Sequence, residues 1–291
     1  MGKIVEAVKA GRILISDGAW GTFLHQKGLR PGECPELWCV EKPEEVLSIA
    51  QSYIDAGADL IKTNSFGGSR FKLSRYGLAE RAAEINEAAA RISRQAAGDD
   101  HWVIASIGPT GKMLVMEDVT ERELYDAFLA QAVALEKGGA DAALIETMSD
   151  MDEAKLAIKA VKENTRLEII CTFTFERTVR GDYRTMMGAD PVSAAQSAVE
   201  AGAGIVGANC GNGMERMIEI ARETRKANKD IPILIHANAG LPRHVDGKDV
   251  FPETPENMAS FVPKLIAAGV SIIGGCCGTT PAHVRAMKEA L

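Results

Sequence analysis

Features that mark membrane, secreted and nucleic-acid-binding proteins are missing from this sequence. No stretch approaches the roughly 18 consecutive apolar residues of a membrane-spanning helix. Residues 1–11 alternate charged with apolar side chains and so contain no signal-peptide core. Lysine and arginine do not cluster, and 33 of them against 40 acidic residues give a net charge of −7. We therefore expect a protein that binds neither a membrane nor nucleic acid.

Cysteine and aromatic residues are also scarce. The six cysteines in 291 residues form no framework of the secreted, disulfide-rich kind, which favours a reducing cytoplasm. Aromatic residues make up only 5% of the chain. Hydrophobic residues nevertheless reach 46%, which is enough to build a large buried core.

The chain repeats one unit, an apolar strand followed by an amphipathic helix, eight times. Residues 19–42 are interpreted as a long connection and residues 176–190 as a loop, and Pro263 is expected to kink the helix that contains it. The expected strands are 13–18, 59–63, 102–106, 142–146, 168–173, 204–209, 232–236 and 270–273. The expected helices are 43–56, 79–97, 121–137, 152–163, one starting at 191, 215–227, 255–268 and 281–288.

Eight such units predict a (β/α)8 TIM barrel, an α/β fold, as a single domain over residues 1–291. Near-continuous apolar strands are typical of a parallel sheet that is covered by helices, and eight strands close it into a barrel. An open, doubly wound sheet is the alternative. No G-x-G-x-x-G follows the first strand, which weakens that alternative.

Polar residues stand where the predicted strands end, and in a barrel these ends meet at one mouth. Three of the six cysteines are among them, on the sixth and eighth strands. The polar residues at the strand ends are Asp17, Thr63, Asn64, Ser65, Ser106, Glu146, Thr172, Thr174, Asn209, Cys210, Asn238, Cys276 and Cys277.

Cys210, Cys276 and Cys277 can therefore meet around one metal ion. Thiolates favour zinc, and three of them leave a fourth tetrahedral position open, as in catalytic sites. Adjacent strand residues point to opposite faces, so Cys276 and Cys277 converge only if the strand ends irregularly, which the flanking glycines permit. Such a zinc can hold a substrate thiol as the thiolate at neutral pH, which favours S-alkylation. The alternative is that the cysteine pair only packs in the core.

Six motifs together carry a resemblance to a known family. The chain resembles the homocysteine S-methyltransferase family, which includes the homocysteine domain of cobalamin-dependent methionine synthase and betaine–homocysteine methyltransferase. The resemblance covers essentially the whole chain in order. The motifs are DGAWGT at 17–22, TNSF at 63–66, IGPTG at 107–111, GANC at 207–210, NAGLP at 238–242 and GGCCGTTP at 274–281.

The resemblance implies a zinc barrel that converts homocysteine to methionine, with zinc on the three cysteines. It implies that Asp17 and Glu146 hold the amino group of homocysteine, a role that suits carboxylates. Backbone amides around Ala19 and Trp20 are implied to receive its carboxylate.

Other polar residues have no single role at this stage. Ser65, Asn209 and Asn238 either orient the substrate or cap loops. His236 is expected to be a hydrogen-bonded core residue and Cys171 a packing residue, while Cys34 and Cys39 are unassigned.

The methyl donor is the open question. Because the sequence ends soon after the eighth helix, a methylated corrinoid is expected on a separate protein, and the motifs at 107–111 and 238–242 favour this donor. S-methylmethionine or a betaine-type donor is the alternative. A betaine would need aromatic partners, for which Trp20, Phe66 and Tyr76 are candidates. Methyltetrahydrofolate used directly is the least favoured.

Two other classes of protein stay open. One is a barrel enzyme with a phosphate site at the glycines before the last helix. The other is a non-enzymatic zinc or thiol redox module.

Overall fold

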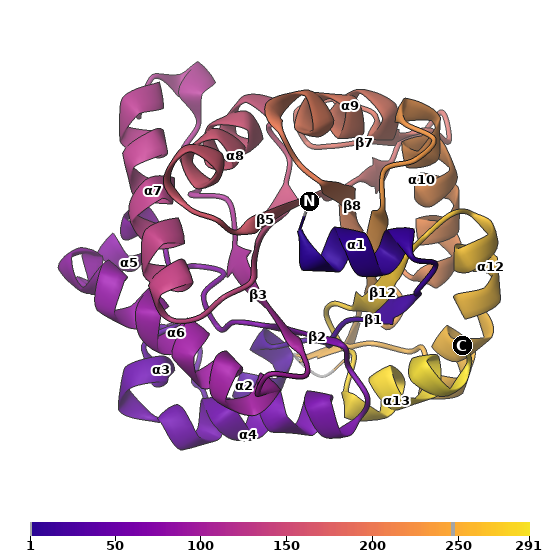
Figure 1. The fold of residues 1–291 in the computed structure, drawn as a ribbon, viewed down its shortest axis with the longest axis horizontal. Helices are drawn as coiled ribbons and strands as arrows, with labels where there is room; N and C mark the ends of the chain where they lie inside the picture. The colour runs from indigo at the N-terminus through magenta and orange to yellow at the C-terminus, as the bar shows by residue number, and fades with distance from the viewer. Residues whose placement is uncertain (1, 246–247) are drawn as a thin grey trace.

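The structure is a computed structural model that describes residues 2–245 and 248–291. Eight parallel strands form one sheet in the order β1-β12-β9-β8-β5-β4-β3-β2, and a bridge between Ser16 and Leu60 joins its two edges. The predicted (β/α)8 barrel is thereby confirmed (Figure 1). The strands are β1 (Leu14–Ile15), β2 (Leu60–Lys62), β3 (Trp102–Ile107), β4 (Ala142–Met148), β5 (Glu168–Phe173), β8 (Ile205–Asn209), β9 (Ile233–Ala237) and β12 (Ile272–Gly275).

The helices expected between the strands surround the barrel. The helix expected at 255–268 is broken at Phe261 into two short helices. Pro263 lies in the first turn of the second one, in agreement with the predicted kink. The helices are α4 (Pro43–Asp55), α6 (Ala82–Ala97), α7 (Glu121–Lys137), α8 (Met151–Asn164), α9 (Pro191–Ala201), α10 (Met214–Ala227), α11 (Pro255–Ser260), α12 (Val262–Ala267) and α13 (Pro281–Glu289).

The barrel buries two apolar layers. One lies between the strands and the outer helices, and the other fills the barrel below the mouth with side chains such as Leu60, Leu144 and Ile272. Helix α1 (Lys3–Lys9) covers the opposite opening, where Ile4 packs into the inner layer. Figure 1 shows α1 lying across this opening. One end of the barrel is therefore closed by apolar contacts, and polar chemistry is confined to the other.

The long connection at 19–42 and the loop expected at 176–190 both contain short regular elements that were not expected. The first contains helices α2 (Gly21–Gln26) and α3 (Trp38–Glu41), and the second contains the hairpin β6 (Glu176–Arg177) and β7 (Tyr183–Arg184). Other short elements in the connections include α5 (Arg70–Ser74) and the hairpin β10 (Arg243–Val245) and β11 (Lys248–Val250). These elements are too short for a periodic pattern, so tertiary contacts decide them.

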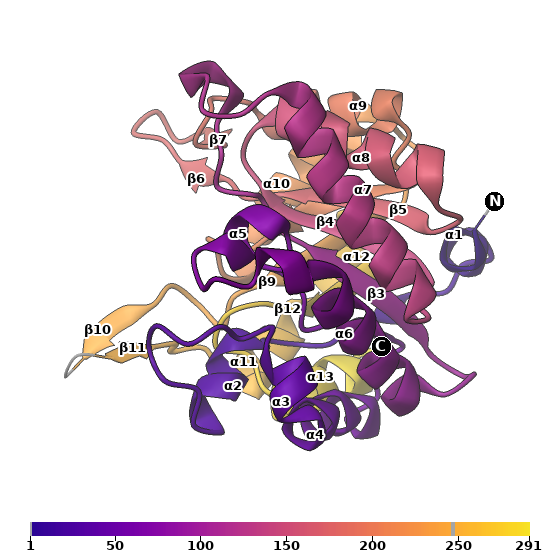
Figure 2. The same ribbon diagram turned by 90° about the vertical axis from the view of Figure 1, so that its left-hand side faces the viewer.

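Both hairpins lie on the side of the barrel away from α1. Figure 2 shows β6–β7 and β10–β11 projecting from the face at which the strands end. Among the residues that the structure describes, no helix is long and apolar enough to cross a membrane. The mouth with its projecting loops is the face on which the polar strand ends meet.

Candidate active site

The three predicted cysteines converge at the mouth. The sulfur atoms of Cys210, Cys276 and Cys277 all lie within 4.8 Å of one another, and those of Cys210 and Cys277 are 3.9 Å apart. Two sulfurs that each lie about 2.3 Å from a tetrahedral zinc are separated by about 3.8 Å. The three thiols therefore form a cluster that can hold a metal ion.

The irregular strand end that this convergence required is present. Strand β12 stops at Gly275, and a turn follows in which the amide of Thr279 donates to the carbonyl of Cys276 at 3.1 Å. A Cβ on Gly275 would lie 2.2 Å from Thr279 Oγ1, and Gly278 has a φ of +81°. Both positions thus require glycine, and the turn lets Cys276 and Cys277 leave the alternation of the strand.

Cys210 also lies outside its strand. It follows β8 with a φ of 61°, a left-handed conformation that is uncommon for a residue other than glycine. Its amide donates to the carbonyl of His236 at 3.1 Å, and its carbonyl accepts from the amide of Asn212 at 2.8 Å. These bonds hold a strained backbone that turns the sulfur toward the pair on β12.

The three thiols shift one another's pKa values. Hydrogen bonds from Cys276 and Cys277, together with one from Asn238, lower the pKa of the Cys210 thiol. The same contacts raise the pKa of Cys276, and Cys210 and burial raise that of Cys277. A metal cation that displaces the thiol protons would meet three preformed ligands.

Asp17 is at the mouth, but its carboxylate is bonded within the protein. Lys62 Nζ lies 2.6 Å from Asp17 Oδ1, and both side chains are buried. The other oxygen accepts the amide of Lys62 at 2.8 Å and the indole Nε1–H of Trp20 at 2.7 Å. The predicted contact between Asp17 and a substrate amino group stays a prediction.

Lys62 was missed by the interpretation of the sequence. Burial lowers the pKa of its ammonium, but the charges of Asp17 and Glu146 outweigh this and raise it overall. The signal was a lysine in the apolar strand Leu60–Lys62, two residues after the inward-facing Leu60. Alternation along a strand places such a residue inside the barrel.

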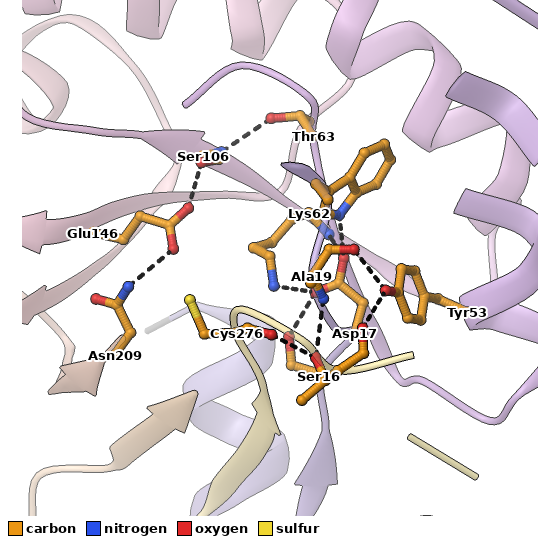
Figure 3. Close-up of polar contacts among 12 residues, drawn as sticks. Ser16, Asp17, Ala19, Tyr53, Lys62, Thr63, Ser106, Glu146, Asn209 and Cys276 are labelled. Carbon is orange, nitrogen blue, oxygen red and sulfur yellow. Dashed lines mark hydrogen bonds and ion pairs between the residues drawn. The ribbon is translucent and has the colours of Figure 1, made fainter. Parts of the chain in front are cut away.

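Glu146 faces the mouth from β4 (Figure 3). The register of β4 against β5 shifts between Ile145 and Met148, and Thr147 has a φ of 61°. One carboxylate oxygen accepts a short hydrogen bond from Ser106 Oγ, while the other lies 3.5 Å from Asn209 Nδ2. Burial raises the pKa of Glu146, and the charge of Lys62 opposes that rise. Glu146 therefore has an oxygen that can still accept a strong hydrogen bond, whereas both oxygens of Asp17 already accept hydrogen bonds from the protein.

Ser65 and Asn209 serve the barrel wall. Ser65 Oγ donates to the carbonyl of Ser106 at 2.7 Å. The side-chain oxygen of Asn209 accepts from Thr172 Oγ1 at 2.7 Å and from the amide of Thr147 at 2.8 Å. Both residues are fully buried. They connect the strands on either side of Glu146.

The Ala19 amide, expected to receive a carboxylate, is also engaged. It donates to Thr279 Oγ1 at 3.0 Å, and that hydroxyl donates to the carbonyl of Cys276 at 2.7 Å. The hydroxyl of Tyr53 donates to the carbonyl of Ala19 at 2.6 Å. Neither Thr279 nor Tyr53 was singled out from the sequence. Together they tie the loop after β1 to the cysteine turn.

The side chains of four remaining candidates are not part of the metal cluster. His236 is buried as expected, but the expectation of a hydrogen bond was wrong, since neither ring nitrogen has a partner among the described residues. Burial keeps the pKa of His236 well below its usual value. Cys171 is fully buried in the core, as expected. Cys34 bonds to Glu36, and Cys39 lies against the carbonyl of Asn64.

The fold and the thiol cluster define the class of protein: a (β/α)8 barrel with a candidate thiolate metal site at its mouth. Residues 14–291 match the family described as Homocysteine S-methyltransferase. The methionine synthases of Mycobacterium leprae (strain TN) and Mycobacterium tuberculosis (strain ATCC 25618 / H37Rv) are 32% and 30% identical, over 97% and 98% of this chain. The chain spans about a quarter of the length of these two proteins, 24% and 25%.

Solved structures show the same fold. The metallated form of the homocysteine methyltransferase MmuM from Escherichia coli matches with a TM-score of 0.80 at 22% identity, over 98% of this chain and 99% of that one. This chain belongs to the homocysteine S-methyltransferase family, and the family places it among the methyltransferases.

Proposed function

We propose that this protein transfers a methyl group to the thiol of homocysteine and so forms methionine. The observation that carries the proposal is the cluster of three thiols beside Glu146 at the mouth of a barrel of this family. Zinc, when bound by Cys210, Cys276 and Cys277, would act as a Lewis acid that keeps a substrate thiol deprotonated at neutral pH.

The rest of the mouth would position the amino acid. Glu146 has an oxygen available for a charge-assisted hydrogen bond to the ammonium group, whereas the carboxylate of Asp17 is already paired with Lys62. The sulfur of homocysteine then forms a bond to the methyl carbon. The bond from that carbon to the donor breaks, and its electron pair leaves with the donor.

For the donor we propose a methylated corrinoid. The similarity to two methionine synthases at 30% and 32% identity supports this choice over an S-methylmethionine or betaine-type donor. A betaine would need free aromatic faces, and Trp20, one of the three candidates, is buried. A reducing, cytoplasmic setting is favoured by the six unpaired cysteines.

The test is methionine formation from homocysteine with reduced, zinc-loaded protein. Methylcobalamin, S-methylmethionine and glycine betaine are offered separately, and methionine is measured by mass spectrometry. Methionine from methylcobalamin alone supports the full proposal, and methionine from another donor corrects the donor. If zinc-loaded protein neither binds homocysteine nor methylates it with any donor, the proposed reaction is wrong.

A further inference from the structure

Lys62 places a buried cation inside the mouth. Its side chain is 8% exposed, and its ammonium lies 2.6 Å from the fully buried carboxylate of Asp17. Figure 3 shows the side chain reaching from β2 into the space between Asp17, Glu146 and Cys276. The charges of Glu146 and Cys276 both act on this ammonium. A cation thus stands where a substrate must lie if its sulfur is to reach the cysteines.

This cation changes what the two acids can do. Asp17 accepts from the ammonium and amide of Lys62 and from the indole of Trp20, so its bonding capacity is largely filled. A second ammonium against Asp17 would be repelled by Lys62 at short range and low dielectric. Glu146, which is bonded to Ser106 and only weakly to Asn209, is the acid that remains for a substrate amine.

The carboxylate of the substrate, unlike its ammonium, would be attracted by Lys62. The amide of Ala19 already donates to Thr279. An ammonium group has three N–H donors, and the bond to Asp17 uses one of them. A substrate carboxylate beside Lys62 would therefore gain a charge-assisted hydrogen bond from one of the remaining N–H donors.

We propose that Lys62 binds the carboxylate of the acceptor thiol, while Glu146 alone binds its ammonium. This inference rests on the proposed function and defines the substrate class of the same site. The site would take short ω-thiols that carry a carboxylate and would discriminate against thiols that carry only an amine. Asp17 then acts as a positioning residue that holds the Lys62 ammonium in place.

Two analogues of homocysteine separate the roles of its charged groups. 4-Mercaptobutyrate keeps the thiol and carboxylate but lacks the amine, and 3-mercaptopropylamine keeps the thiol and amine but lacks the carboxylate. Binding of each to zinc-loaded protein is measured by calorimetry without a methyl donor. We expect the wild-type protein to bind 4-mercaptobutyrate more tightly than 3-mercaptopropylamine.

Replacing the cation should reverse this order. Lys62→Met is expected to weaken homocysteine and 4-mercaptobutyrate by about 10- to 100-fold, the usual loss of one hydrogen bond to a charged group. Binding of 3-mercaptopropylamine should be unchanged or tighter. Lys62→Arg should keep part of the carboxylate affinity. Lys112→Met, which removes a half-buried lysine of the β3–α7 connection that is paired with Asp118, is the control and should bind all three thiols normally.

A second variant keeps the test decisive if Lys62→Met folds poorly. Lys62→Met leaves the charge of Asp17 buried without its partner, so the double variant Lys62→Met/Asp17→Asn, which removes both charges, is measured beside it. If 4-mercaptobutyrate and homocysteine bind these variants as tightly as wild type, the inference is wrong. If homocysteine fails to bind wild type while 4-mercaptobutyrate binds in a Lys62-dependent way, the proposed substrate is wrong and the role of Lys62 stands.

Discussion

The hydroxyl of Thr279 lies 3.0 Å from the backbone nitrogen of Ala19, although 260 residues separate the two in the chain. The same hydroxyl donates to the carbonyl of Cys276. One oxygen thus joins the loop after the first strand of the barrel to the turn that carries two of the three cysteines. Because it accepts one hydrogen bond and donates another, a methyl group of the same shape cannot replace it.

Thr279→Val is expected to lower the free energy of unfolding by about 1–3 kcal/mol, since the buried amide of Ala19 loses its acceptor. It should also weaken zinc binding by about 10- to 100-fold, the usual effect of removing a group that orients a metal ligand. Denaturant unfolding and competition with a zinc chelator measure the two effects.

The matched control is Thr224→Val in α10. Thr224 is also buried, but its hydroxyl has no partner among the described residues. Its removal should leave stability unchanged or raise it. Equal effects of the two substitutions would contradict the role given to Thr279.

The three thiols should act as one metal site. Cys210→Ala, Cys276→Ala or Cys277→Ala is expected to remove bound zinc, measured as zinc per protein chain, and to abolish methionine formation. Cys171→Ala is the control, because this thiol is buried in the wall of the barrel away from the cluster, and it should keep its zinc. Normal zinc content and near-normal turnover in a variant of the cluster would rule out that cysteine as a ligand.

A substitution at Gly207 tests how closely strands β8 and β9 pack. A Cβ at this position would lie 1.8 Å from the carbonyl oxygen of Leu234 in β9, which is backbone and cannot turn aside. Gly207→Ala should therefore destabilise the protein by more than about 3 kcal/mol or prevent folding.

Gly21→Ala is its counterpart. Nothing lies within 4 Å of a Cβ there, and its φ is not positive, so the same chemical change should be neutral or stabilise by about 0.4–1 kcal/mol. Thermal unfolding compares the two variants. A mild effect at Gly207 would mean that the β8–β9 spacing is wider than described.

Glu146 should govern binding at acidic pH. Burial raises its pKa above the ordinary value of 4.5, and only the ionised form attracts an ammonium. Affinity for homocysteine should therefore fall as the pH drops through this raised pKa, at a higher pH than for an exposed glutamate. Glu146→Gln should bind homocysteine weakly and lose this part of the pH profile, which calorimetry at a series of pH values measures. An unchanged acidic limb in this variant would assign the titration to another group.

The same pKa shift has a defined effect on stability. The folded protein holds the proton on Glu146 more tightly than the unfolded chain does. Its contribution to stability is therefore present below about pH 4.5 and is lost as the pH rises through the raised pKa. Glu146→Gln should thus unfold at pH 7 no more easily than wild type.

Regular elements could be predicted well because they repeat a local pattern. All eight barrel strands and the helix Glu121–Lys137 follow from apolar periodicity and flanking signals. The helices in 19–42 and the two hairpins could not be predicted, because elements of two to six residues have no period to detect. The polar strand ends did identify the mouth, since parallel strands must end on the same side.

The sequence by itself determined the barrel and the meeting of Cys210 with Cys276 and Cys277, since strand number and strand ends set both. Only the tertiary structure decided which polar groups are already bonded. Lys62 and Asp17 stand 45 residues apart, and Ala19 and Thr279 stand 260 apart. Periodicity tells which face of a strand a side chain occupies. Its partner depends on barrel closure, which brings distant strands and loops within hydrogen-bonding distance.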